Sequence, residues 1–164
     1  MPKKIAIILG SDSDLPVLEK GFKLTEKLGL DFELRILSAH RTPEAVTEYI
    51  ASLDERGIDV IIAGAGKAAH LPGVIASQTV KPVIGLPIRA SLDGVDALYS
   101  IVQMPGGIPV ATVGINASDN AVLLAAQILA LKYPEITKNL EAHRVEMRNV
   151  VLEKDRKIQE KYNK

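Results

Sequence analysis

The 164-residue sequence contains no cysteine and no tryptophan, and aromatic residues make up only 4% of it. Without cysteine the chain has no thiol nucleophile, no disulfide framework and no cysteine-ligated zinc or iron–sulfur centre. Lysine and arginine together number 20, as do aspartate and glutamate, so neither sign of charge is in excess. A nucleic-acid surface needs a basic excess and usually aromatic rings for stacking, and we therefore expect no nucleic-acid partner.

Long hydrophobic runs are also lacking near the start of the sequence. The apolar run that ends at Gly10 has only five residues, Ile5 to Leu9. This run is too short for the apolar part of a signal peptide or for a membrane span, so we expect a cytoplasmic protein with no membrane partner. With 47% apolar residues, a chain of this length can bury a core as a single domain.

Short β-branched runs alternate with helical patterns along the first 115 residues. Between the early runs, apolar residues recur at helical spacing, as at Leu15, Leu18 and Phe22. This alternation predicts right-handed crossovers and a doubly wound α/β fold, a three-layer sandwich in which helices cover both faces of a central parallel sheet. The predicted buried strands cover residues 5–9, 32–37, 60–63, 83–86 and 110–115.

Two further helices are predicted after the last strand. Residues 119–131 are rich in alanine and leucine and apolar almost all round, which indicates a buried helix. Pro134 then opens a polar, lysine- and glutamate-rich segment with regularly spaced apolar residues, which predicts an extra C-terminal helix. We interpret it as an arm that packs partly on another subunit, with a solvated tail as the alternative. The expected organisation is one domain over 1–164, with an α/β core over 1–133 and a helical arm over 134–164.

In open α/β sheets, ligands bind at the carboxyl ends of the strands, so the polar residues that follow each strand are the candidates for a site. The first such loop, residues 10–16, carries two serines and two aspartates. Ser11 and backbone N–H groups could hold a phosphate, whereas the Asp14 carboxylate would repel phosphate but accept hydrogen bonds from ribose hydroxyls. Capping of the following helix is the simpler interpretation.

The second loop has the sequence Ser38-Ala39-His40-Arg41-Thr42-Pro43-Glu44. Thr42 as N-cap and Pro43 as first helical residue account for the start of a helix. His40 and Arg41 are not needed for that. An arginine can clamp a phosphate through two hydrogen bonds, and histidine is the side chain whose unperturbed pKa suits proton transfer at neutral pH. His40 is therefore a candidate general acid and base, with an ordinary surface histidine as the alternative.

The third loop, residues 63–73, is rich in glycine and alanine and includes His70. Its glycines match neither a dinucleotide fingerprint, which belongs after the first strand, nor a P-loop, because Ala68 stands where serine or threonine is required. Small residues would let the backbone approach a ligand closely, while His70 is either a ligand contact or a structural histidine. The chain has three histidines and no His-x-x-x-His pair, so we expect no metal.

Read together, these loops closely resemble the N5-carboxyaminoimidazole ribonucleotide mutase family of purine (IMP) biosynthesis. The resemblance covers about the first 130 residues in order. The matching stretches are Gly10-Ser11-Asp12-Ser13-Asp14, Ser38-Ala39-His40-Arg41-Thr42-Pro43, Ala63-Gly64-Ala65-Gly66, Ala68-Ala69-His70-Leu71-Pro72-Gly73 and Tyr99-Ser100-Ile101-Val102-Gln103-Met104-Pro105.

The resemblance implies a flavodoxin-like subunit in a homo-octamer, an isomerase that acts without metal or cofactor. Its substrate would be an aminoimidazole ribonucleotide whose carboxylate moves from the exocyclic nitrogen to ring carbon 4. By position, His40 would be the general acid and base, and His70 matches the family's second histidine. Ser11, Asp14 and Arg41 would bind the ribose phosphate, and Ser38, Ala39, Gly66, Ala68, His70 and Leu71 would surround the imidazole and the migrating carboxyl group.

Two positions depart from the family pattern. Gly106 stands where relatives often have arginine, and Lys67 stands where the family usually has glycine. Because positive φ is costly for a residue with a β-carbon, we expect Lys67 to have negative φ, with its ammonium group outside the pocket.

Two other functions compete with the mutase. A carboxylase that adds free CO2 to aminoimidazole ribonucleotide is the nearer one, although the Gly66 to Pro72 segment resembles the mutases more. A non-catalytic mononucleotide-binding module would explain the first loop, but it gives no reason for His40 beside Arg41.

Overall fold

The computed structural model describes residues 4–163, so residues 1–3 and 164 of the predicted domain lie outside the described part. A parallel sheet of five strands in the order β2-β1-β3-β4-β5 forms the centre of the fold. This is the flavodoxin-like order, and it confirms the predicted doubly wound α/β class. The strands are β1 (Lys4–Leu9), β2 (Asp31–Ile36), β3 (Ile58–Gly66), β4 (Val83–Ile88) and β5 (Ala111–Thr112).

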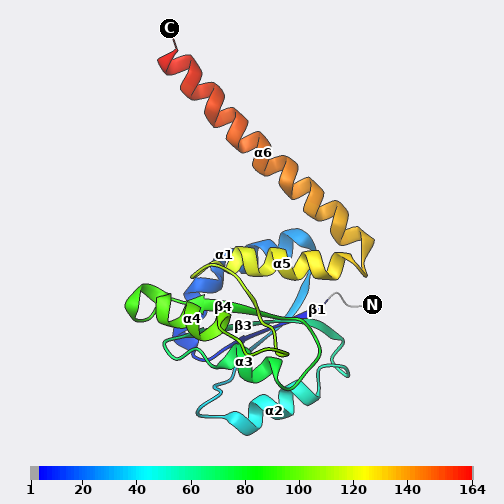
Figure 1. Cartoon of the computed structure of the whole chain (residues 1–164). Helices are drawn as coiled ribbons and strands as arrows, with labels where there is room; N and C mark the ends of the chain where they lie inside the picture. The colour runs from blue at the N-terminus through cyan, green and yellow to red at the C-terminus, as the bar shows by residue number, and fades with distance from the viewer. Residues whose placement is uncertain (1–3, 164) are drawn as a thin grey trace.

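Helices cover both faces of the sheet because successive strand residues face opposite sides. On β1, Ile7 belongs to a core shared with α1 and α5, whereas Ile8 belongs to a core shared with α2, α3 and α4. Figure 1 shows α1 and α5 on one side of the sheet and α2 and α3 on the other. The helices are α1 (Glu19–Leu28), α2 (Pro43–Ala51), α3 (Leu71–Ala76), α4 (Val95–Val102) and α5 (Ser118–Ala130), with 3₁₀ helices η1 (Asp12–Leu18) and η2 (Leu92–Gly94).

The two outer strands differ from the prediction of buried strands. None of the β2 side chains is fully buried, and Phe32 and Ile36 are 38% and 44% exposed. The strand lies at the edge of the sheet and has a neighbour on one side only. At the other edge, β5 has two residues instead of the predicted six. The chain still donates hydrogen bonds to β4 from Val113 and Asn116, but it follows that strand irregularly.

Strand β3 runs to Gly66, three residues beyond its predicted end at Ala63. Its last residues pair with Leu86, Pro87 and Ile88 of β4. A β-carbon on Gly66 would lie 3.0 Å from the Ile88 carbonyl oxygen, so the strand can pass β4 at this point because the residue is glycine.

The predicted C-terminal helix is present as α6 (Pro134–Tyr162). Its first turns pack on the core, where Ile136 is fully buried and the Asn139 side-chain amide donates to the Leu28 carbonyl. Beyond the ion pair between Lys27 and Glu146, the helix leaves the body of the molecule and extends away from α1 and α5 (Figure 1).

Candidate active site

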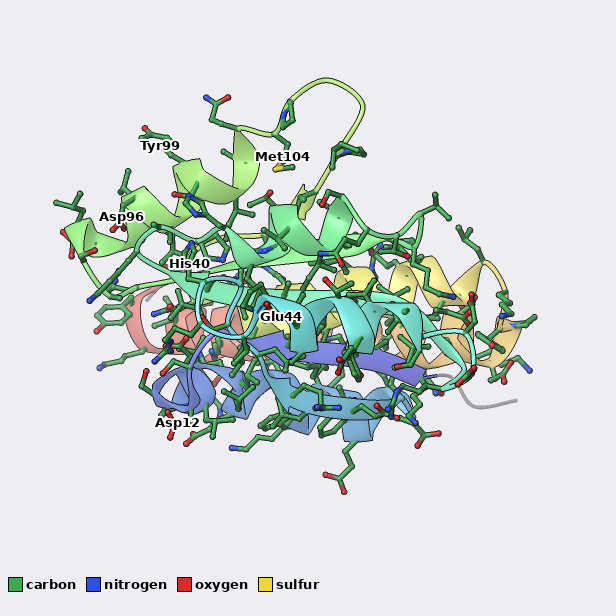
Figure 2. All side chains as sticks on the ribbon, turned by 90° about the horizontal axis from the view of Figure 1, so that it is seen from below. Asp12, His40, Glu44, Asp96, Tyr99 and Met104 are labelled. Carbon is green, nitrogen blue, oxygen red and sulfur yellow. The ribbon has the colours of Figure 1, made fainter. Side chains whose placement is uncertain are left out.

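One pocket at the carboxyl end of the sheet collects all three loops singled out in the sequence. It has a volume of about 480 Å³, which lies in the range of pockets for small molecules, ~300–1,000 Å³. In the view of Figure 2, His40 lies between η1, which carries Asp12, and α4, which carries Asp96 and Tyr99. All ten predicted site residues line it: Ser11, Asp14, Ser38, Ala39, His40, Arg41, Gly66, Ala68, His70 and Leu71.

In the first loop, which connects β1 to η1, the side chains of Ser11, Ser13 and Asp14 form a series of hydrogen bonds. The Ser11 side chain caps η1 by accepting a hydrogen bond from the Ser13 backbone N–H, and the two serine oxygens lie 2.8 Å apart. The Ser13 hydroxyl donates to the Asp14 carboxylate at 3.3 Å. Burial raises the pKa of the Asp14 carboxyl, the Ser13 hydrogen bond lowers it, and the nearby Asp12 charge raises it further.

The second loop is held in a tight turn by Ser38 and Thr42. The Thr42 side-chain oxygen accepts from the Ser38 N–H at 2.9 Å, and the Thr42 N–H donates to the Ser38 carbonyl at 2.9 Å. The Ser38 hydroxyl accepts from the Arg41 N–H at 3.1 Å. Thr42 is at the predicted N-cap position of α2, but its hydroxyl closes the turn instead of bonding to the helix. These bonds fix the backbone that carries His40.

Arg41 extends from this turn toward the first loop. Its guanidinium group donates to the Gly10 carbonyl at 3.2 Å. This contact places the positive charge of Arg41 beside the loop that carries Ser11, as a shared phosphate site would require.

His40 and His70 come from different loops and meet in the pocket. The Nε2 atom of His40 lies 2.8 Å from the Nδ1 atom of His70, and the two rings are nearly perpendicular. A hydrogen bond between two ring nitrogens needs one N–H and one lone pair. In this geometry the pair can therefore carry at most one positive charge, and a single proton is held between two bases.

The third loop corrects the expectation for Lys67. Its φ angle is +55°, in the left-handed region, instead of the predicted negative value. Because β3 continues to Gly66 and α3 begins at Leu71, only four residues connect them, and the His70 N–H bonds back to the Ala68 carbonyl. The tight turn imposes the left-handed angle on Lys67. The residue also lines the pocket.

Besides the ten predicted residues and Lys67, four more residues line the pocket: Gly10, Ser13, Ala65 and Ala90. Gly10 and Ser13 belong to the first loop, next to the predicted Ser11 and Asp14. Ala90 follows β4, and the same rule that polar loops at carboxyl strand ends form the site would have directed attention to that segment. Gly106 is exposed and does not line the pocket.

Within residues 4–163, no three histidine, cysteine, aspartate or glutamate side chains gather closely enough to hold a metal ion. None of the helices described in this part of the chain is long and apolar enough to cross a membrane.

The family model described as AIR carboxylase matches residues 4–150. A protein of Thermotoga maritima named N5-carboxyaminoimidazole ribonucleotide mutase is 54% identical over 161 residues, covering 98% of this chain and 94% of that protein. A protein of the same name from Pyrococcus abyssi is 58% identical over 149 residues, covering 90% and 85%. The crystal structure of Treponema denticola PurE has a TM-score of 0.85 at 30% identity, covering 95% of this chain and 98% of that one.

Proposed function

Since the chain belongs to the AIR carboxylase family, we propose that it interconverts N5-carboxyaminoimidazole ribonucleotide and 4-carboxy-5-aminoimidazole ribonucleotide in purine biosynthesis. It is an isomerase, as are the mutases that are 54% and 58% identical to it. The observation that carries the assignment of roles is the hydrogen-bonded pair of His40 and His70 in a pocket that also contains Ser11 and Arg41.

The nucleotide is held at one end of the pocket by its phosphate and ribose. Ser11, Asp14 and Arg41 perform this binding, with the guanidinium group and the amides of the first loop supplying positive charge and donors. The imidazole ring then lies toward the histidine pair, among Ser38, Ala39, Gly66, Ala68 and Leu71. These residues are small or apolar, which suits a ring that carries no charge.

The reaction begins with a proton transfer. Protonated His40 donates a proton to the carbamate nitrogen. The bond between this nitrogen and the carboxyl carbon then breaks, the electron pair of the bond stays on nitrogen, and CO2 is released into the pocket. Carbon 4 of the ring then attacks CO2 with its π electrons and forms the new carbon–carbon bond. Neutral His40 removes the proton from carbon 4, which restores the aromatic ring and returns the histidine to its starting state.

The second histidine supports both halves of this cycle. His70 accepts from or donates to His40 as the latter gains and loses its proton, so the imidazole remains oriented in both states. A pocket that keeps CO2 next to the nucleotide replaces a slow bimolecular recapture by a positioned reaction.

The same family membership supports the larger organisation. We propose a cytoplasmic homo-octamer of single-domain subunits, with residues 1–133 as the catalytic core and residues 134–164 as an arm that contacts another subunit. The apolar residues on the outer half of α6 support that contact, because they are exposed in the single subunit. A carboxylase that uses free CO2 is not favoured, since the relatives at 54% and 58% identity are named as mutases.

The proposed function is tested by supplying the two possible substrates separately. The purified enzyme is incubated with the carbamate nucleotide at low bicarbonate, and in parallel with aminoimidazole ribonucleotide plus bicarbonate. A mutase forms the carbon-carboxylated product from the first mixture. Product from the second mixture only would identify the free-CO2 carboxylase, and binding without product from either would identify a nucleotide-binding module.

A further inference from the structure

Lys67 is the pocket residue that neither the family pattern nor the proposed mechanism explains. It has a left-handed backbone angle, with φ of +55°, which is unfavourable for any residue with a β-carbon. Glycine would fit this turn without strain. A strained residue that lines a ligand pocket is a reason to look for a role in ligand binding.

The Lys67 ammonium group has no carboxylate partner among residues 4–163. Every ion pair found in that part of the chain involves other residues. Lys67 is exposed and is one of the residues that line the pocket. Its charge is therefore not neutralised by an acidic side chain of that part of the chain, in contrast to Lys4, Lys27 and Lys81, which are paired.

The charged residues that line the pocket are few and unevenly distributed. Arg41 and Lys67 are the cations and Asp14 is the anion, apart from the two histidines. The Arg41 guanidinium is next to Gly10, at the first loop. Lys67 comes from the third loop, three residues before His70, whose ring touches His40. The two cations thus come from different loops, Arg41 contacting the first loop and Lys67 standing on the loop that carries His70.

We propose that Lys67 binds the carboxylate of the nucleotide, as an anion-binding residue at the reacting end of the site. This inference rests on the proposed function, because both the substrate and the product of that reaction carry a phosphate and a separate carboxylate. Arg41 serves the phosphate, and Lys67 is the remaining cation on the loop that holds His70. An ammonium group is a compact donor that pairs with a single carboxylate as a point charge.

The charge of the carboxyl group changes during the reaction, and this change determines what the contact with Lys67 contributes. The carboxylate is negative in substrate and product but becomes neutral CO2 between them. An ammonium group near it therefore stabilises the bound nucleotides and contributes nothing extra to the transition state for CO2 release. Lys67 should lower KM without raising kcat, so it is a binding residue and not a catalytic one.

The test compares two nucleotides that differ only in the carboxylate. Dissociation constants of 4-carboxy-5-aminoimidazole ribonucleotide and of 5-aminoimidazole ribonucleotide are measured by calorimetry for wild type and Lys67→Met, which keeps the aliphatic stem and the backbone strain. Loss of a partly exposed charged contact should raise Kd for the carboxylated nucleotide by about 5- to 10-fold. Kd for the other nucleotide should change by less than about 2-fold, and kcat should stay the same or rise.

Two matched variants complete the experiment. Lys67→Arg keeps the charge and should bind the carboxylated nucleotide within about 3-fold of wild type, whereas Lys67→Gly, which relieves the strained turn, should behave like Lys67→Met. Equal weakening of both nucleotides would show that Lys67 serves the phosphate, and unchanged binding of both would show that it faces away. Either result overturns the inference. Failure of the wild-type enzyme to convert the carboxylated nucleotides would instead refute the proposed function.

Discussion

At the scale of single residues, the site depends on hydrogen bonds that hold the backbone under a few reactive side chains. Ser38 and Thr42 close the turn that carries His40, and His70 fixes the His40 ring from a separate loop. In the proposed mechanism, the reacting imidazole is thus positioned before any nucleotide binds, which reduces the entropy lost in reaching the transition state.

Replacing His40 by asparagine tests its role as acid and base. The His40→Asn side chain still forms hydrogen bonds but cannot transfer protons. We expect kcat to fall by at least ~10²-fold, the usual contribution of a general acid or base, while nucleotide binding measured by calorimetry persists. Turnover close to that of wild type would remove His40 from the mechanism.

Thr42 provides a test of positioning as opposed to chemistry. Thr42→Val keeps the shape of the side chain and removes the hydroxyl that accepts from the Ser38 N–H. We expect kcat to fall by about 10-fold as His40 becomes less well oriented, with the pH dependence of kcat unchanged because the titrating groups remain. Thr42→Ser restores the hydroxyl and should recover most of the rate. A Thr42→Ser variant as slow as Thr42→Val would contradict this role.

Most residues of the site could be predicted from the sequence, because the motifs are long and the carboxyl ends of parallel strands meet at one edge. The backbone of Lys67 could not. The penalty for a left-handed lysine is only about 1–2 kcal/mol, and the tertiary constraint of a four-residue connection between β3 and α3 outweighs it. The strand-end rule points to the segment after β4 but does not single out Ala90, because a small apolar residue carries no chemical signal of its own.

At the scale of elements, β1 and β2 are tied to α2 by a group of polar side chains around Glu33. Its carboxylate accepts hydrogen bonds from Lys4 on β1, from the Tyr49 hydroxyl on α2 at 3.0 Å and from Arg56 at 3.2 Å. The hydrogen bond from Lys4 lowers the pKa of Glu33, burial acts against it, and the Tyr49 hydrogen bond lowers it further. Burial raises the pKa of the Tyr49 hydroxyl, which therefore remains a donor. Helix α2 begins directly after the turn that carries His40, so this cluster holds in place the helix to which that turn is attached.

The Glu33→Gln variant tests this anchor through its pH dependence. A carboxyl whose pKa is lowered in the folded state stabilises the fold above its ordinary pKa of 4.5, and that contribution disappears as the pH falls through the lowered value. At pH 7 we expect the variant to lose about 1 kcal/mol, or roughly 2–4 °C in melting temperature. The difference from wild type should shrink below pH 4.5. A difference that is constant across this range would show that charge is not involved.

The type and order of the strands could be predicted, but the ends of β3 and β5 could not. Gly64 and Gly66 have low strand propensity, yet they continue β3. A β-carbon on Gly64 would collide with Leu9, and one on Gly66 would press on the Ile88 carbonyl of β4, so glycine fits both positions. At the edge, the Val110 to Ile115 run has the composition of a strand, but only Ala111 and Thr112 are paired with β4. Tertiary packing decides both cases.

At the scale of the whole molecule, α6 extends far beyond the first turns that pack on the core of the single subunit. Leu140, Met147, Val151, Ile158 and Tyr162 lie on one face of the helix by their spacing. The inner end of that face packs on the core at Leu140, and its continuation beyond the core is exposed, with Val151 at 63% and Ile158 at 56%. The sequence pattern predicted the helix, and the exposed part of this face is where we propose that another subunit packs.

Shortening the chain tests whether this face contacts another subunit. Deletion of the residues beyond Lys138 should reduce the size or the thermal stability of the oligomer. The double variant Val151→Ser, Ile158→Ser should act in the same direction while leaving the subunit fold intact, because both side chains are exposed in the monomer. Light scattering and thermal melting measure the outcome. An unchanged mass and melting temperature in both variants would identify α6 as a solvated tail.

The proposed reaction moves one carboxyl group within one nucleotide. It is tested most directly with carbamate nucleotide labelled with ¹³C in its carboxyl group, incubated with wild-type enzyme in unlabelled bicarbonate. If CO2 stays in the pocket between its release and its capture by carbon 4, the carboxyl group of the product keeps most of the label at early times. A product whose carboxyl group has the isotopic composition of the surrounding bicarbonate from the first turnover would contradict transfer within one nucleotide.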